Sequence, residues 1–426
     1  MSETLIVKGG RVVDQSGSRL ADVAIEDGRI VGVGADLSGG RILDAAGCVV
    51  SAGLVDLHVH LREPGKEEAE TIETGSRSAA LGGFTAIVAM PNTTPAIDSA
   101  AVVREVQELG RAANLVDVYV AGAITVGRKG THLAPMGEMA ALGVRFFTDD
   151  GNGVQDGRLM RRAMEYAVGL GVTLAQHCED DAICGGGVMH EGEWSSRLGL
   201  PGQPSETEEL MVMRDIILAR LTGATVHFQH LSTRRSLDYI RQARAEGLPV
   251  SAEATPHHFT LTHAACAGYD TVFKVNPPLR TDDDVAAVRV ALGDGSVDCI
   301  ATDHAPHTST DKELPFDQAP PGMIGLETAL ALALTELHLP IEKVLSLMSW
   351  QPARLARAID AHGGVLRAGR PANLCVIDPL ATWTVDASAM ASKSRNSPFV
   401  GRSLRGRVRH TVFNGVAVVQ DGEATR

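Results

Sequence analysis

The sequence predicts an α/β protein, a (β/α)8 TIM barrel with a small β-sandwich formed from both ends of the chain. In the middle section, short apolar segments alternate with amphipathic helical patterns, and eight such units occur. The two ends instead carry short strand-like segments separated by turns. A chain of 426 residues is long for one domain but suits a large barrel with a small addition.

Eight apolar segments of the middle section are the expected barrel strands. Amphipathic stretches such as SAAVVREVQELGRAA and STRRSLDYIRQARAEG lie between them, and Ser232 is the expected N-cap of the second stretch. Strands that alternate with helices indicate a parallel sheet, and eight units fit a closed barrel. A doubly wound open sheet is the alternative, but no Gly-rich phosphate motif follows the first strand. The expected strands are residues 54–60, 85–90, 116–123, 144–149, 172–177, 225–231, 249–257 and 298–304.

Both ends of the chain alternate apolar residues with Gly- and Asp-containing turns, as in LIVKGGRVVD and RVRHTVFNGVAVVQDG. Neither end is long enough to build a good core of its own. We therefore expect residues 1–53 and 363–426 to pair into one β-sandwich beside a barrel of residues 54–362.

The composition excludes several classes of protein. A net charge of −13 argues against nucleic acid or an anionic membrane surface as the main partner. The start, MSETLIVKGG, lacks the pattern of a signal peptide, and no apolar stretch approaches the roughly 20 residues that span a bilayer. We expect a cytoplasmic protein with reduced cysteines, because the six cysteines include no CxxC pair. Cys178, beside His177, is expected to pack in the core.

Functional side chains of such a barrel lie at the C-terminal ends of its strands. His58 and His60 end the first strand, and period-two alternation turns both toward the barrel interior, where two imidazoles can hold one metal ion. Each such residue alone has an ordinary structural interpretation, but their joint occurrence at five strand ends predicts a centre for zinc or a similar ion. The other strand ends add Asp149, Asp150, His177, His230 and Asp303.

Six protein ligands are too many for a single catalytic ion that keeps an open position. They suit two ions that share a carboxylate and a water, and the pKa of that water falls toward ~7. One ion is expected to be held by His58, His60 and Asp303, and the other by His177 and His230, with Asp149 or Asp150 between them.

The motifs around these residues resemble the amidohydrolase superfamily and, more closely, the dihydroorotases of the longer bacterial type. The resemblance covers nearly the whole chain, and the combination of HVHLREPG, MPNTTP and ATDHAPH is specific. The matching motifs are DLHVHLREPG, AMPNTTP, FFTDDG, QHCED, HLST, TPHH, KVNPPLR and ATDHAPH.

The fourth strand distinguishes subgroups of this superfamily. Relatives that act on hydantoins, dihydropyrimidines or allantoin place a carboxylated lysine there as the bridging ligand, whereas GVRFFTDDG contains no lysine. The resemblance implies that Asp150 is the bridge, with Asp149 in a supporting role and Lys129 a solvated loop residue. It also implies that histidines among His257, His258 and His304 orient ligands.

The resemblance further implies the substrate contacts. Arg62 would bind the carboxylate of dihydroorotate bidentately, because a guanidinium matches a carboxylate in geometry. Residues 307–322, long, polar and Pro-rich, would form a lid over the site. The implied substrate-binding residues are His60, Arg62, Asn92, Asn276, His307, Pro321 and Gly322.

The implied reaction is the reversible hydrolysis of dihydroorotate to N-carbamoyl-L-aspartate, the third step of pyrimidine biosynthesis. Two Zn2+ ions per subunit would act with Asp303, the catalytic general base and then acid. The alternatives are another cyclic amidohydrolase, such as a hydantoinase or allantoinase, and a noncatalytic barrel that serves as an assembly partner. The resemblance also implies a homodimer or a complex with aspartate transcarbamoylase.

Overall fold

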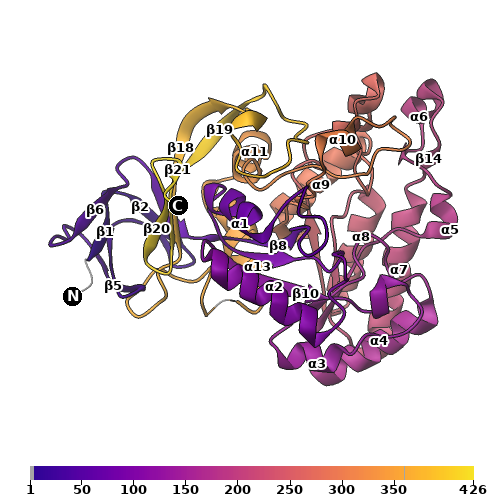
Figure 1. Cartoon of the computed structure of the whole chain (residues 1–426), viewed down its shortest axis with the longest axis horizontal. Coiled ribbons are helices and arrows are strands. Elements are labelled where there is room, and N and C mark those ends of the chain that lie inside the picture. Colours follow the sequence, from indigo (N-terminus) through magenta and orange to yellow (C-terminus); the bar gives the residue numbers. More distant parts are fainter. Residues whose placement is uncertain (1–3, 359) are drawn as a thin grey trace.

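The computed structural model describes residues 4–358 and 360–426, so residues 1–3 and 359 of the expected sandwich and barrel ranges lie outside it. A strand barrel surrounded by helices occupies one end of the molecule, and two β-sheets that contain both chain ends lie at the other (Figure 1). Among the described residues, no helix is long and apolar enough to cross a membrane.

Eight parallel strands form the barrel, and their order in the sheet follows the chain. Val59, at the end of the first strand, pairs in parallel with His304, just beyond the last strand, and this contact closes the barrel. The closed order confirms the predicted barrel and excludes the doubly wound alternative. The strands are β8 (Leu54–Val59), β9 (Phe84–Ala89), β10 (Asp117–Gly122), β11 (Phe146–Phe147), β12 (Thr173–Gln176), β15 (Val226–Phe228), β16 (Val250–Ala254) and β17 (Cys299–Ile300).

Helices cover the outside of the barrel through apolar faces. In α2, for example, Val102, Val103 and Val106 recur at helical spacing and are buried against the barrel strands. Thr233, not the expected Ser232, caps α8, because the Thr233 hydroxyl accepts the Ser236 amide; Glu208 accepts the hydroxyls of both residues. The main helices are α1 (Ile72–Leu81), α2 (Ala100–Ala113), α3 (Met136–Ala141), α4 (Gly157–Leu170), α7 (Glu206–Thr222), α8 (Arg234–Ala245), α9 (Asp282–Asp294) and α11 (Ala329–Glu336).

Shorter elements decorate the barrel. An excursion after β12 contains one parallel strand pair and two short helices, and three further short helices lie after β17. These elements are α5 (Asp181–Cys184), β13 (Met189–His190), α6 (Glu193–Leu198), β14 (Gly202–Gln203), α10 (Ser309–Lys312), α12 (Ile341–Leu345) and α13 (Gln351–Leu355).

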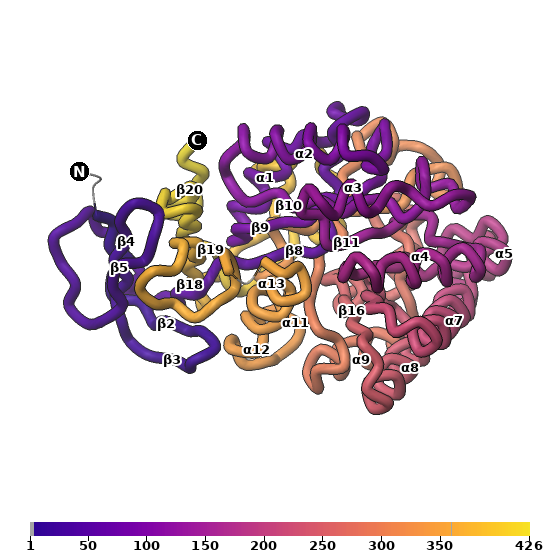
Figure 2. Tube along the Cα trace, turned by 90° about the horizontal axis from the view of Figure 1, so that it is seen from below, coloured from indigo at the N-terminus to yellow at the C-terminus, as the bar shows by residue number. Residues whose placement is uncertain are grey.

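Strands from the two ends of the chain share one sheet, as predicted. β7 pairs antiparallel with β18, so that Ala52 lies opposite Leu374 and Val50 opposite Val376. Figure 2 shows β18 to β20 lying beside the N-terminal strands. A common apolar core joins this sheet to a second one made of N-terminal strands alone, which completes the β-sandwich.

The order of the larger sheet is β21-β20-β19-β18-β7-β2-β3, and that of the smaller is β5-β4-β1-β6. Their strands are β1 (Leu5–Lys8), β2 (Arg11–Asp14), β3 (Gly17–Leu20), β4 (Asp22–Glu26), β5 (Arg29–Gly34), β6 (Arg41–Asp44), β7 (Val49–Ala52), β18 (Leu374–Thr384), β19 (Ser403–Phe413), β20 (Val416–Gln420) and β21 (Glu423–Ala424).

Candidate metal centre

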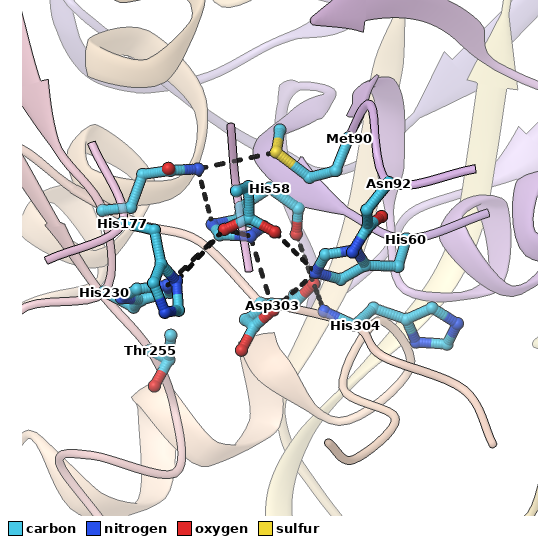
Figure 3. Close-up of polar contacts among 12 residues, drawn as sticks. His58, His60, Met90, Asn92, His177, His230, Thr255, Asp303 and His304 are labelled. Carbon is cyan, nitrogen blue, oxygen red and sulfur yellow. Dashed lines mark hydrogen bonds and ion pairs between the residues drawn. The ribbon is translucent and has the colours of Figure 1, made fainter. Parts of the chain in front are cut away.

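The imidazoles of His58 and His60, at the end of β8, point to the same side, as strand alternation requires. The Nε2 atoms of His58 and His60 lie 3.4 and 3.0 Å from Oδ1 of Asp303, which follows β17. The ring centroids of His60 and His230 each lie 5.2 Å from that of His58 (Figure 3). Residues from distant parts of the chain therefore meet at one end of the barrel.

Asp150 lies between two groups of imidazoles. Its Oδ1 is 3.2 Å from His58 Nε2, 3.4 Å from His177 Nδ1 and 3.7 Å from His230 Nε2. Its other oxygen, Oδ2, is 3.5 Å from His60 Nε2. The structure thus brings all six predicted ligand side chains together, each of them at most 5% exposed.

The donor set fits a metal ion. Ligand bonds of about 2.0–2.2 Å in a tetrahedral arrangement place neighbouring donor atoms about 3.3–3.6 Å apart, close to the distances above. His58 Nε2 and Asp150 Oδ1 are buried and lack hydrogen-bond partners, which an ion between them would supply. One close trio is His58, His60 and Asp303, as predicted.

A second close trio contains His58, Asp150 and His230, where the predicted grouping has His177 in place of His58. His177 Nδ1 nevertheless lies 2.9 Å from His230 Nε2, so it borders the same space. A third trio, His227, Glu253 and Cys299, is buried in the barrel strands.

Side chains that the sequence analysis did not single out hold the imidazoles in place. Glu253, on β16, accepts a hydrogen bond from His58 Nδ1 at 2.7 Å, and Glu179 accepts one from His177 Nε2 at 2.7 Å. The only signal for Glu253 was a charged residue in an otherwise apolar strand, VSAEA. Buried carboxylates that accept from ligand imidazoles are a common support of metal centres.

The charges of the centre reinforce one another. Burial would raise the pKa of Asp303, but the neighbouring His58 and His60 outweigh it and hold that pKa well below its usual range. Burial would also raise the pKa of Glu253, but His58 and His227 outweigh this effect and lower that pKa to about 2. Against the effect of burial, hydrogen bonds to Asp150 and Glu179 raise the pKa of His177 to about 10. The carboxylates therefore attract positive charge, which a metal ion provides.

Asp149 points away from the cluster and holds the loop after β10. Its Oδ1 accepts hydrogen bonds from the amides of Ile124 and Thr125, each at 2.9 Å, and its Oδ2 accepts one from the Thr125 hydroxyl. Adjacent aspartates thus serve opposite faces, and Asp150 alone enters the cluster.

A cavity of about 190 Å³ opens over the cluster, and all seven residues expected to bind substrate line it. Asn92 Oδ1 is 2.8 Å from His60 Nδ1, so its amide group also orients an imidazole of the candidate metal centre. The residues of this cavity that were expected to bind substrate are His60, Arg62, Asn92, Asn276, His307, Pro321 and Gly322.

Arg62 is anchored in the cavity wall and is 8% exposed. Its Nε donates to the Pro306 carbonyl at 3.0 Å, and its Nη2 lies 3.3 Å from Nε2 of His307. Burial lowers the pKa of Arg62 to about 10, which leaves the guanidinium charged at neutral pH. Burial and the nearby Arg62 lower the pKa of His307 to about 2, so this ring is neutral.

The remaining histidines near the site bond elsewhere. His304 lies 3.3 Å from Glu70 and accepts the Gly325 amide, and His258 bonds to Thr255 and the Pro277 carbonyl. Nε2 of His257 is buried without a partner. Cys178 is buried in the core, and burial raises the pKa of its thiol well above the usual value, in agreement with the predicted packing role.

Comparisons with known proteins agree with this arrangement. A family model described as dihydro-orotase-like matches residues 47–236. The dihydroorotase of Pelotomaculum thermopropionicum is 49% identical over 98% of this chain and 99% of its own. That of Mycobacterium tuberculosis is 46% identical over 99% of both chains. Among solved structures, the L-hydantoinase (dihydropyrimidinase) of Arthrobacter aurescens has a TM-score of 0.90 and 26% identity, covering 100% of this chain and 98% of that one.

Proposed function

The chain belongs to the dihydroorotase family, and we propose that its site opens and closes the six-membered ring of dihydroorotate. In the reverse direction, N-carbamoyl-L-aspartate cyclises with loss of water, the third step of pyrimidine biosynthesis. The observation that carries the proposal is the charged Arg62 in the wall of a cavity whose floor is the cluster of histidines and aspartates. Such a cavity suits a cyclic amide that carries a carboxylate.

We propose two Zn2+ ions per subunit as the resident metal. His58, His60 and Asp303 would hold one ion and His177 and His230 the other, with Asp150 shared. When bound, zinc lowers the pKa of a shared water toward ~7 and polarises the carbonyl that is attacked. Zinc is a borderline ion that binds imidazole nitrogens and carboxylate oxygens, the donors that these residues supply.

Side chains and backbone groups of the chain bind and orient the substrate. Arg62 binds the substrate carboxylate, with hydrogen bonds from Asn92 and His307, and this fixes the ring over the cluster. Asn276 and the backbone of Pro321 and Gly322 hold the amide groups of the ring.

Asp303 is the group that moves the proton. It takes a proton from the attacking water and passes it to the ring nitrogen that leaves, so it acts first as general base and then as general acid. The neighbouring imidazoles hold the pKa of Asp303 well below its usual range, so Asp303 is ionised at neutral pH, the state that a general base requires.

The wider proposal concerns the context of the enzyme. Residues 54–362 form the catalytic barrel, with residues 1–53 and 363–426 as the supporting sandwich. The enzyme works in the cytoplasm as a homodimer or with aspartate transcarbamoylase. Light scattering of the purified chain, alone and mixed with that partner, tests the assembly.

The decisive experiment is a comparison of substrates. The purified chain is freed of metal, reloaded with Zn2+, and incubated separately with dihydroorotate, hydantoin and allantoin. We expect turnover of dihydroorotate in both directions, about two zinc ions per chain, and no turnover by the metal-free protein. Turnover of hydantoin or allantoin without dihydroorotate would instead identify one of the alternative cyclic amidohydrolases. The noncatalytic alternative predicts missing ligands, whereas all six side chains are present.

A further inference from the structure

A chain of buried polar side chains runs from the metal centre into the interior of the barrel. Glu253 is fully buried, and one of its oxygens lies 2.7 Å from His58 Nδ1. Its other oxygen lies 3.0 Å from Nε2 of His227, on the neighbouring strand β15. Nδ1 of His227 lies 2.8 Å from the Ser251 hydroxyl. We call these residues, His58, Glu253, His227 and Ser251, the Glu253 chain.

With an ion bound at Nε2 of His58, the contacts of the Glu253 chain favour one pattern of protons. An ionised carboxylate only accepts hydrogen bonds, so both imidazole nitrogens that face Glu253 must carry a hydrogen. His58 then carries a hydrogen on Nδ1, and its Nε2, which lies 3.2 and 3.4 Å from the carboxylates of Asp150 and Asp303, is the nitrogen that faces the ion. His227 donates from Nε2, so its Nδ1 accepts from Ser251.

Glu253 has no arginine or lysine partner among the ion pairs of the described residues, which join it only to His58 and His227. The amide of His230 adds a hydrogen bond at 3.3 Å. An ionised carboxylate costs several kcal/mol to bury unless opposite charge compensates it. That compensation is completed when a cation binds to Nε2 of His58.

We propose that Glu253 is a positioning residue for the metal ligand His58, fixing its tautomer and orientation and strengthening its hold on the ion. This inference rests on the proposed function only in taking His58 as a ligand. Carboxylates that support ligands in this way contribute about 10–100-fold to metal affinity. His227 and Ser251 in turn fix the orientation of Glu253.

The trio of His227, Glu253 and Cys299 has the donors of a separate metal site, but the hydrogen bonds argue against one. Both oxygens of Glu253 already accept from imidazoles, and His227 Nδ1 is engaged with Ser251. The variant Cys299→Ala therefore keeps the zinc content of the wild type, and loss of an ion from this variant would overturn the assignment of Glu253 as a support.

The main test measures zinc binding without substrate. Metal-free wild type and Glu253→Gln are titrated with Zn2+ against a chromophoric chelator, and folding is checked by circular dichroism. We expect about 10–100-fold weaker binding of one of the two ions in Glu253→Gln. Equal affinity for both ions in a folded variant would overturn the proposal.

Asp56→Asn is the matched control. Asp56 is another fully buried carboxylate, on the same strand as His58, but it accepts hydrogen bonds from the backbone amides of His58 and Thr302 and touches no imidazole. Burial raises the pKa of Asp56 to about 7, so the titrations are made at pH 8, where the change removes the same charge, and zinc affinity within about two-fold of the wild type is expected. If Asp56→Asn weakened zinc binding as much as Glu253→Gln, buried charge in general, and not positioning of His58, would be responsible.

A second measurement uses the wild-type protein, so it does not depend on whether a variant folds. Nitrogen-15 NMR of the zinc-loaded wild type reports which nitrogen of His58 carries the hydrogen, and the proposal requires Nδ1. Hydrogen on Nε2 alone would overturn it. Because neither measurement uses substrate, a protein that meets both expectations but leaves dihydroorotate unchanged would refute the proposed function and leave the role of Glu253 standing.

Discussion

The two sides of the cavity are built from different parts of the fold. The ligand side consists of residues at strand ends: His58, His60, Asp150, His177, His230 and Asp303. The loop side consists of residues that the loops between strands and helices supply: Arg62, Asn92, Asn276, His307, Pro321 and Gly322. Strand ends fix side chains closely enough for metal binding, whereas loops can be exchanged to suit a substrate.

The hydrogen bonds of the two sides differ in the same way. Imidazoles of the ligand side bond to carboxylates and to one another, as in the contacts of Glu253 and Glu179. On the loop side, Arg62 and His307 bond to backbone carbonyls of the loop after β17, those of Pro306 and Pro321. Changes on the ligand side should therefore impair the chemistry, and changes on the loop side should impair substrate binding.

The largest effect is expected from Asp303→Asn, on the ligand side. The amide keeps an oxygen donor but cannot carry the proton, so kcat should fall by about 10²–10⁴-fold with little change in KM. Turnover is measured together with zinc content, which should stay near that of the wild type. Full turnover with both ions bound would remove Asp303 from the proton transfer.

Arg62→Lys tests the loop side. Lysine keeps the charge but loses the planar fork and the bond to the Pro306 carbonyl. We expect kcat/KM for dihydroorotate to fall by about 10–100-fold, mainly through KM, because a charge-assisted contact contributes about 1.5–3 kcal/mol. A fall in kcat alone, or loss of zinc from this variant, would break the division between the two sides.

A smaller effect on the loop side is expected from Asn396→Ala. Nδ2 of Asn396 donates to the carbonyls of Ala305 and Gly322 at 3.0 and 3.1 Å, and Oδ1 accepts from the His307 amide. Losing these bonds should raise KM by about 5–10-fold, equivalent to about 1 kcal/mol. Ser397→Ala, which removes a hydroxyl bonded within its own segment to Phe399, serves as the control and should leave KM unchanged.

Glu327→Gln, outside the cavity, should leave turnover unchanged but alter the pH dependence of stability. Burial raises the pKa of Glu327 to about 7, although hydrogen bonds from the Ser78 hydroxyl and the Ala391 amide act in the opposite direction. The folded state therefore binds a proton between pH ~4.5 and 7 that the unfolded state does not, and this contribution to stability is lost as the pH rises through 7.

Denaturant unfolding at pH 5 and pH 8 measures this contribution. The free energy of unfolding of the wild type should fall by on the order of 2 kcal/mol more than that of Glu327→Gln between these two values. Parallel pH dependences in the two proteins would show that Glu327 is ionised in the fold, like the carboxylates of the ligand side.

The ligand side could be predicted from the sequence because it depends on local rules. Alternation along β8 places His58 and His60 on one face, and the barrel rule brings the ends of distant strands together. The adjacent Asp149 and Asp150 could not be told apart locally. Only the family resemblance selected Asp150, and the structure places its carboxylate among the imidazoles.

The supporting contacts could not be predicted, because they join residues that only the folded chain brings together. Glu253 meets His58 across the barrel, and Asn396 reaches the cavity wall from the C-terminal segment. Likewise, Glu208 of the preceding helix accepts the hydroxyls of both Ser232 and Thr233 at the start of α8. Spacing along the sequence carries no information on such contacts.

The pairing of β7 with β18 sets the order in which the chain can complete its fold during synthesis. Ala52 pairs with Leu374, which the ribosome adds only about 320 residues later. At about 5–20 residues per second, a ribosome needs roughly 15–60 s to make that length. During this interval one edge of β7 lacks its partner and presents free amides and carbonyls that can pair with other chains. Chaperones that bind nascent strands would therefore act on this protein mainly at its N-terminal end.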